Sequence, residues 1–215
     1  MTYSVKEIYY TLQGEGANAG RPAVFLRFAG CNLWSGREGD RGNGPGGCSA
    51  WCDTNFVGTD GPGGGKFVSA RDLAKEARGH WPEENADRGA YIVCTGGEPL
   101  LQLDPALILE LHNVGFAIAV ETNGTIEPPP GIDWLTVSPK ANSELKARRG
   151  QELKLVYPQA TLNPSDFEPL EFQYHFLQPL DGLCKDFNTK AALDYCLAHP
   201  QWRLSLQTHK LIGIP

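Results

Sequence analysis

Short apolar runs alternate along this chain with helical patterns and with polar or glycine-rich connections. Seven segments are candidate β-strands. They are residues 23–28, 90–94, 116–120, 134–137, 153–157, 174–177 and 203–206. Three segments follow a helical pattern, and each has a recognisable start or stop signal. Ser69 caps a helix that ends at Arg78, Asp104 and Pro105 open one that ends before Gly115, and a third runs from Asn188 to His199 before Pro200.

This alternation predicts βα units around a mainly parallel sheet. A complete eight-stranded barrel usually needs about 250 residues, whereas the chain has 215. Other connections, such as residues 127–131, are too short or too rich in proline for a full helix. We therefore expect an α/β fold, an incomplete (β/α) barrel of about six strands and about three full helices. Residues 1–215 should form a single domain.

The composition excludes several classes of partner. The formal net charge is −6, with Lys and Arg scattered along the chain, which argues against nucleic acid because phosphate binding needs a basic face. No apolar run approaches the roughly 20 residues of a membrane span, and residues 1–10 do not read as a signal peptide. We expect a cytoplasmic protein, in which the six cysteines are ligands, reactive thiols or buried small residues rather than disulfides.

A glycine-rich segment at residues 31–66 contains Cys31, Cys48 and Cys52. A loop this long inside a compact domain is usually functional or disordered. Three thiolates can hold a [4Fe–4S] cluster while one iron stays open for S-adenosylmethionine, as catalytic zinc keeps an open position. Structural zinc and unliganded thiols are the alternatives, although no histidine lies between Asn32 and Gly79.

Polar clusters follow the predicted strands. Residues 94–99 (CTGGEP) end the second strand, and their glycines would let a ligand lie against the backbone, while Glu98 could accept hydrogen bonds from an ammonium group. Similar clusters follow the other strands, at residues 121–123, 138–140, 178–179 and 207–209. Each could be a solvated turn on its own, but the carboxyl ends of barrel strands carry active sites. Together the clusters predict one functional rim.

The cysteine loop followed by CTGGEP resembles the radical S-adenosylmethionine superfamily. The flanking motifs resemble, more narrowly, the 7-carboxy-7-deazaguanine synthase family. They are residues 10–16 (YTLQGEG), 27–34 (RFAGCNLW), 52–54 (CDT), 121–124 (ETNG), 138–140 (SPK) and the run from Gln207 to Pro215. The likeness covers nearly the whole chain, with one departure: three residues separate Cys48 from Cys52, where the superfamily usually has two.

The resemblance implies a role for each matching residue. Cys31, Cys48 and Cys52 would bind the [4Fe–4S] cluster, and Thr54 would bind Mg²⁺. The S-adenosylmethionine site would contain Trp51, Cys52, Asp53, Gly97, Ser138, Pro139, Lys140, Gln178, Pro179, Leu180 and Asp181, with Leu180 acting through its backbone. The substrate would contact Leu12, Gln13, Gly14, Arg27, Thr95 and the terminal carboxylate of Pro215. The planar guanidinium of Arg27 suits a carboxylate.

The resemblance also implies an incomplete barrel of the radical type and a carbon–nitrogen lyase of 7-deazapurine (queuosine) biosynthesis. The reaction would convert 6-carboxy-5,6,7,8-tetrahydropterin to 7-carboxy-7-deazaguanine with loss of ammonia. A flavodoxin- or ferredoxin-like electron donor and a homodimer are implied as well. Two rivals remain at this point: an enzyme that activates a glycyl-radical protein, and a non-catalytic zinc-binding module.

Overall fold

The computed structural model describes residues 2–85 and 89–215, and all the strands in this part of the chain belong to one sheet. The described residues form nine strands and four α-helices. The strands are β1 (Tyr3–Leu12), β2 (Pro22–Phe28), β3 (Gly65–Phe67), β4 (Tyr91–Gly96), β5 (Ala117–Thr122), β6 (Trp134–Val137), β7 (Arg149–Tyr157), β8 (Glu171–Pro179) and β9 (Trp202–Leu204). The helices are α1 (Ala70–Gly79), α2 (Pro105–Asn113), α3 (Lys185–Ala198) and α4 (Thr208–Ile212).

The sheet order is β3-β1-β2-β4-β5-β6-β7-β8-β9. Every pair from β2 to β9 is parallel, which makes seven parallel strands within the described residues. These seven are the predicted strands. The strands β1 and β3 add an antiparallel edge that the apolar pattern did not predict, so the sheet has nine strands rather than about six. The fold is the expected α/β partial barrel.

The predicted helices form with their expected caps. The Ser69 hydroxyl accepts a hydrogen bond from the Asp72 backbone N–H, and the Asp104 carboxylate accepts one from Leu107. Such caps satisfy backbone donors that a helix start leaves unpaired. The third helix begins at Lys185, three residues before the predicted start. The short helix α4 was not predicted.

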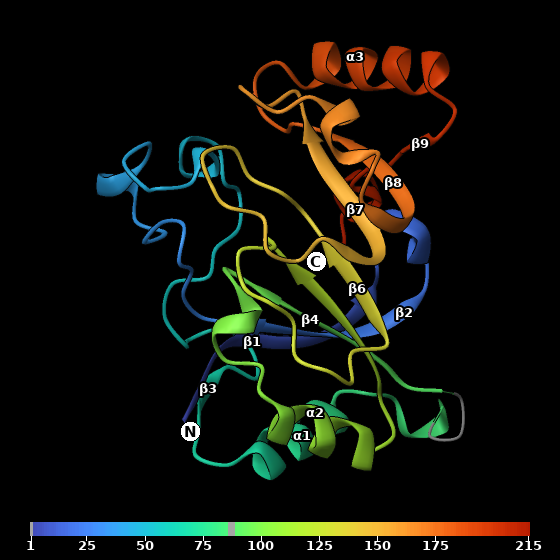
Figure 1. Cartoon of the computed structure of the whole chain (residues 1–215). Helices are drawn as coiled ribbons and strands as arrows, with labels where there is room; N and C mark the ends of the chain where they lie inside the picture. Colours follow the sequence, from blue (N-terminus) through green and yellow to red (C-terminus); the bar gives the residue numbers. More distant parts are fainter. Residues whose placement is uncertain (1, 86–88) are drawn as a thin grey trace.

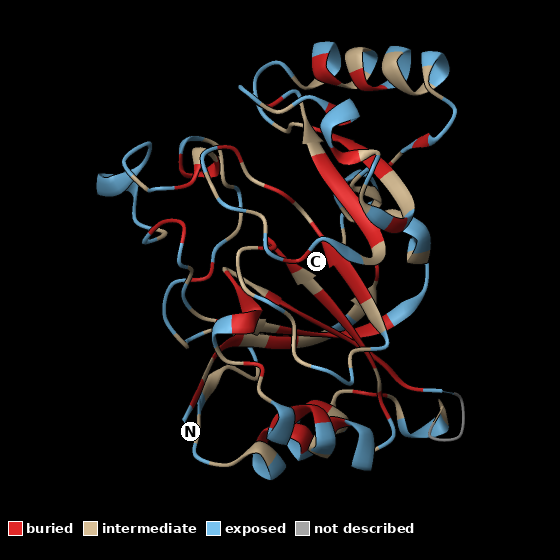
Figure 2. Ribbon diagram, in the orientation of Figure 1, coloured by how far each residue is buried: buried red, intermediate tan, exposed pale blue. Residues whose placement is uncertain are grey.

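Alternation along the strands divides the sheet into two faces. Residues such as Val24, Leu26 and Ile92 point outward and pack with Leu73 of α1 and Leu107 of α2 in the main core. Figure 1 shows α1 and α2 side by side on one side of the sheet and α3 beside the far edge strands. Figure 2 shows the buried face of α1 and α2 turned toward the strands. The opposite, inner face of the sheet is left to form the site.

No helix among the described residues is both long and apolar enough to cross a bilayer.

Candidate active site

The inner face of the sheet becomes polar toward the carboxyl ends of the parallel strands. The deeper part of this face carries a small cluster that includes Phe25, Tyr91 and Val93. Because side chains alternate along a strand, the next inward residues on these two strands are Arg27 and Thr95. A polar residue from each of six successive parallel strands thus lines one cavity of about 350 Å³. They are Arg27, Thr95, Glu121, Thr136, Lys154 and Gln178.

The glycine-rich loop brings its three cysteines to the same cavity. Cys31 follows β2, Cys48 lies in a 3₁₀ turn at Gly47–Ala50, and Cys52 follows this turn. The backbone N–H of Cys52 donates to the Cys48 carbonyl at 2.8 Å. Residues four apart in a helical turn lie on the same side of it. The three-residue spacer therefore keeps both sulfur atoms on the cavity.

The donor set fits an iron–sulfur cluster. The loop supplies three thiols to one cavity, and thiolates are the usual ligands of such clusters. No three His, Cys, Asp or Glu side chains in the described part of the chain could hold a single metal ion. A [4Fe–4S] cluster differs from a single metal ion because each cysteine binds a different iron. The three thiolates therefore surround the cluster and do not converge on one point. Glycine allows the loop to pack closely here, because a Cβ on Gly47 would lie 2.9 Å from that of Ala141.

Electrostatics links the thiols to Lys140. Burial raises the pKa of Cys31, and it raises the pKa of Cys48 to about 11, with a smaller contribution from Cys52 and a partial offset from Lys140. Burial in turn lowers the pKa of the Lys140 ammonium, although nearby Cys48 and Cys52 oppose this. The Lys140 ammonium is held by the Ser138 carbonyl and hydroxyl. Binding of a metal cluster would have to displace the thiol protons.

Arg27 is fixed in the cavity from one side. Its Nε donates to Glu7 at 2.8 Å, and one Nη donates to the Tyr9 hydroxyl at 3.0 Å. Both partners belong to β1, which pairs with β2 in this region. A guanidinium has five N–H donors, so the end of the group that carries both Nη atoms can still pair with a carboxylate through two hydrogen bonds.

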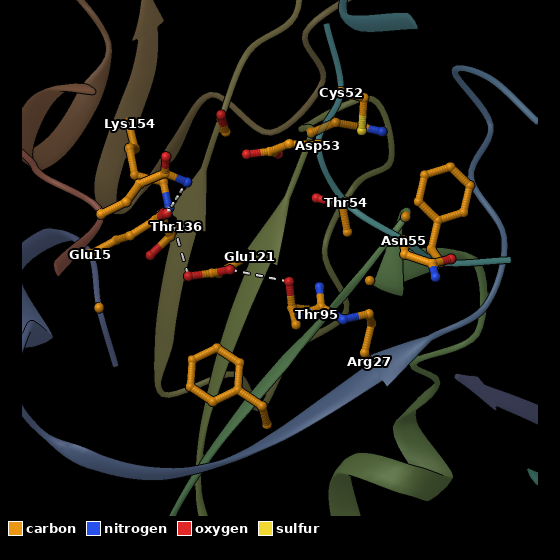
Figure 3. Close-up of a pocket in the computed structure, with 18 of the residues that line it drawn as sticks. Glu15, Arg27, Cys52, Asp53, Thr54, Asn55, Thr95, Glu121, Thr136 and Lys154 are labelled. Carbon is orange, nitrogen blue, oxygen red and sulfur yellow. Dashed lines mark hydrogen bonds and ion pairs between the residues drawn. The ribbon is translucent and has the colours of Figure 1, made fainter. Parts of the chain in front are cut away.

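A buried ammonium lies between two carboxylates on the other side of the cavity (Figure 3). Lys154 donates a hydrogen bond to Glu15, and its Nζ lies 3.7 Å from a Glu121 oxygen. Burial alone would lower the pKa of Lys154, but Glu121 and Glu15 outweigh burial and raise it. Glu121 also accepts hydrogen bonds from Gln13 and Thr95, at 3.1 Å each. This network fixes the position of the carboxylates.

Glu98 has a different role from the one its motif indicated. Its carboxylate is fully buried and accepts hydrogen bonds from the Thr122 hydroxyl and from the backbone N–H groups of Leu100 and Asn123. These bonds join the end of β4 to the end of β5. Glu98 is not among the residues that line the cavity, so the expectation that it accepts from a ligand's ammonium group is corrected to one of holding the rim.

Most of the site residues expected from sequence line this one cavity. They are Leu12, Gln13, Gly14, Arg27, Cys31, Cys48, Trp51, Cys52, Asp53, Thr54, Thr95, Gly97, Ser138, Lys140, Gln178 and Pro215. Pro139, Pro179, Leu180 and Asp181 are not among the described lining residues. The fold uses the backbone of Leu180, whose N–H donates to Tyr157 and whose carbonyl accepts from Asn188.

Several residues at the cavity were not assigned a role from sequence. Glu7 and Tyr9 lie on the unpredicted strand β1, whereas Glu15 and Glu121 were inside recognised motifs but had no role. The available signal for Lys154 was a charge in the middle of an apolar strand pattern (LKLVY, residues 153–157). A buried charge of this kind needs a partner, and its partners are distant in sequence.

An incomplete parallel barrel with three thiols and a glycine turn on its carboxyl rim defines the chain as a radical S-adenosylmethionine enzyme. No family model matches the sequence. The chain is 60% identical over 215 residues to 7-carboxy-7-deazaguanine synthase of Bordetella pertussis and 61% identical over 214 residues to that of Bradyrhizobium diazoefficiens, covering 100% of each. The crystal structure of QueE from Escherichia coli matches with a TM-score of 0.67 and 29% identity, over 97% of this chain and 95% of that one. The chain belongs to the 7-carboxy-7-deazaguanine synthase family.

Proposed function

We propose that this chain, as one domain of residues 1–215, converts 6-carboxy-5,6,7,8-tetrahydropterin to 7-carboxy-7-deazaguanine with release of ammonia. This reaction is a step toward queuosine and related 7-deazapurines. The observation that carries the proposal is that Arg27, fixed by Glu7 and Tyr9, lines the same cavity as the three loop cysteines. A carboxylate-binding group and a candidate cluster site thus share one cavity in a chain 60% identical to a named synthase.

Cys31, Cys48 and Cys52 would bind a [4Fe–4S] cluster and leave one iron for S-adenosylmethionine. When bound, these groups would supply the radical chemistry needed to remove a hydrogen atom from the pterin and later return it. Support comes from the chemistry of the donor set, because all three thiols border one cavity. The buried Lys140, in the electrostatic range of Cys48 and Cys52, would offset negative charge beside the cluster.

The nucleotide half of the site would contain the residues that follow the cysteine loop and the strands on this rim. They are Trp51, Cys52, Asp53, Gly97, Ser138, Pro139, Lys140, Gln178, Pro179, Leu180 and Asp181. Gly97 has a physical reason to be glycine, because a Cβ there would lie 2.2 Å from the Gly30 carbonyl oxygen. Thr54 would offer its hydroxyl oxygen to Mg²⁺, which prefers hard oxygen ligands and keeps several of its waters.

The substrate half would contain Leu12, Gln13, Gly14, Arg27, Thr95 and Pro215. Arg27 would bind the pterin carboxylate through the end of the guanidinium that Glu7 leaves free. Thr95 and Gln13 are already hydrogen-bonded to Glu121, so these three side chains would present fixed polar atoms to the pterin ring. Preorganised polar groups of this kind need little rearrangement during reaction.

We further propose that a flavodoxin- or ferredoxin-like protein supplies the electron and that the chain forms a homodimer. Both follow from the family and concern other molecules, so each needs its own measurement. Reduction of the cluster by a candidate donor protein can be followed spectroscopically, and the mass in solution by light scattering.

The test of the activity is an anaerobic assay with reconstituted protein, a chemical reductant, the carboxypterin, S-adenosylmethionine and Mg²⁺. We expect the carboxydeazapurine to form without any added protein substrate, which separates this activity from activation of a glycyl-radical protein. A Cys48→Ala variant should lose both iron and product. Its matched control is Cys184→Ala, since Cys184 is exposed. Intact cluster without any deazapurine would overturn the proposal.

A further inference from the structure

The side chain of Lys210 joins three segments that are distant in sequence. It lies on α4, and its Nζ donates to Asp53 at 2.5 Å and to Asp181 at 2.7 Å. Asp53 directly follows the last loop cysteine, and Asp181 follows β8. Burial alone would lower the pKa of Lys210, but the hydrogen bonds that it donates to Asp181 and Asp53 outweigh burial and raise the pKa. The ammonium is therefore charged and doubly paired.

The C-terminal strap, defined here as residues 207–215, lies along the cavity. Gln207, His209, Lys210 and Pro215 all line it, and Figure 1 shows the C-terminus near the middle of the sheet. The strap is attached to the end of β1 and to the loop after it by several contacts. Gln207 donates to Glu15 at 3.1 Å, the Thr208 backbone and hydroxyl both donate to Gly14, and the Thr11 hydroxyl donates to Pro215.

These contacts hold the strap to the wall of the cavity that carries the proposed substrate residues. Lys210 instead reaches Asp53, which lines the cavity directly after the cysteine loop, and Asp181, which follows β8. Both aspartates belong to the proposed nucleotide half. Two carboxylates that share one ammonium repel each other once it is removed. Lys210 thus joins the strap to these two segments and also balances their negative charge.

We propose that Lys210 is a positioning residue: it fixes the C-terminal strap across the cavity, so that His209 and Pro215 are held against the bound substrate. The inference deepens the proposed function and rests on it for the identity of the substrate. His209 is closely packed in this arrangement, since a Cβ on Gly14 would lie 2.1 Å from its Nδ1. Without Lys210, the strap would keep its contacts with β1 and the loop after it but would lose those to Asp53 and Asp181, so His209 and Pro215 would be held less firmly.

The first measurement needs neither cluster nor substrate. Hydrogen exchange of the purified protein is compared between wild type, Lys210→Met and Lys185→Met. Lys185 is the matched control, because its Nζ pairs with the same Asp181 carboxylate at 3.4 Å but it lies on α3. We expect Lys210→Met to speed amide exchange across residues 207–215 at least several-fold, and Lys185→Met to leave it unchanged. Lys210→Arg keeps the charge and should stay protected.

The second measurement is the steady-state assay on the reconstituted enzymes. Loss of charged hydrogen bonds that position a binding segment should raise KM for the carboxypterin about tenfold in Lys210→Met, with a smaller change in kcat. Lys185→Met should behave as wild type. Equal exchange protection in the two methionine variants would overturn the inference, even if the wild-type enzyme makes the deazapurine. A wild-type enzyme that makes no deazapurine would overturn the proposed function, while the exchange data would still decide the role of Lys210.

Discussion

Replacing Lys154 by methionine removes the positive charge that Glu15 and Glu121 share. The Lys154 side chain is 7% exposed, and those of Glu15 and Glu121 are 13% and 23% exposed. Methionine has a similar length but no charge, so two carboxylates would remain together in a poorly solvated place. Removing one partner of a buried ion pair costs about 3–5 kcal/mol of stability.

The expected loss of stability lies at the lower end of that range of about 3–5 kcal/mol, because both carboxylates keep other hydrogen bonds. Glu15 keeps hydrogen bonds from Gln178 at 3.2 Å and from Gln207 at 3.1 Å, and Glu121 keeps those from Gln13 and Thr95. We expect a loss of about 3 kcal/mol at neutral pH, which lowers the urea midpoint by about 1 M for a slope of about 3 kcal/mol per molar.

The loss of stability in Lys154→Met should depend on pH. In the wild type, burial raises the pKa of Glu15, but Lys154 outweighs this and the net pKa is lowered. A lowered carboxyl pKa adds stability above the ordinary pKa of glutamate, and this is lost as the pH falls. In the variant, burial acts without Lys154 and the pKa of Glu15 rises. Protonation of Glu15 at low pH then removes the repulsion between the two carboxylates, so the variant loses less stability there. The difference in stability should therefore shrink between pH 7.5 and pH 4.

The assay is urea unfolding followed by circular dichroism, with Lys190→Met as the matched control. Lys190 pairs with Asp194 at 2.8 Å, but both side chains are mostly exposed, and exposed pairs contribute little. Equal urea midpoints for Lys154→Met and the control at pH 7.5 would show that the buried ammonium does not stabilise the fold. A difference that grows toward pH 4 would contradict the expected rise in the pKa of Glu15.

Two further substitutions test the substrate half. Glu7→Gln removes the charge that holds Arg27 Nε and should raise KM for the carboxypterin about tenfold; an unchanged KM would show that Glu7 does not position Arg27. Gly14→Ala places a methyl group 2.1 Å from His209 Nδ1, so kcat/KM should fall at least about tenfold by displacement of a group that is proposed to lie against the substrate. The control is Gly39→Ala, where a Cβ meets nothing within 4 Å, and equal activity of the two alanine variants would contradict the expected displacement.

The sequence was sufficient for the parallel part of the fold because most of its strands are largely apolar, with isolated charges such as Arg27 and Lys154. It was insufficient for β1, where Lys6 and Glu7 interrupt the pattern. Lys6 is nearly buried and pairs with Asp60 at 2.6 Å, and Glu7 pairs with Arg27 on β2. The charges in this strand are compensated by partners 54 and 20 residues away, which a local pattern does not show.

The candidate site divides in the same way. The loop cysteines and the strand-end motifs are local features, so their assembly at one rim follows from the parallel topology. The bond of Glu98 to the end of β5 and the bridge from Lys210 to Asp53 depend instead on how distant segments pack. Side chains whose role is to hold other groups in place were therefore the ones that sequence motifs misassigned or left without a role.

The proposed chemistry requires that Cys31, Cys48 and Cys52 together hold a [4Fe–4S] cluster with one iron free of protein ligands. Mössbauer spectroscopy of ⁵⁷Fe-reconstituted protein, recorded with and without S-adenosylmethionine, tests it most directly. We expect the signal of one iron in four to change when S-adenosylmethionine is added, since the nucleotide would bind there. Four iron signals that stay unchanged when the nucleotide is added would show that no iron is open to it. A loop that binds zinc in place of iron and sulfide would exclude the cluster.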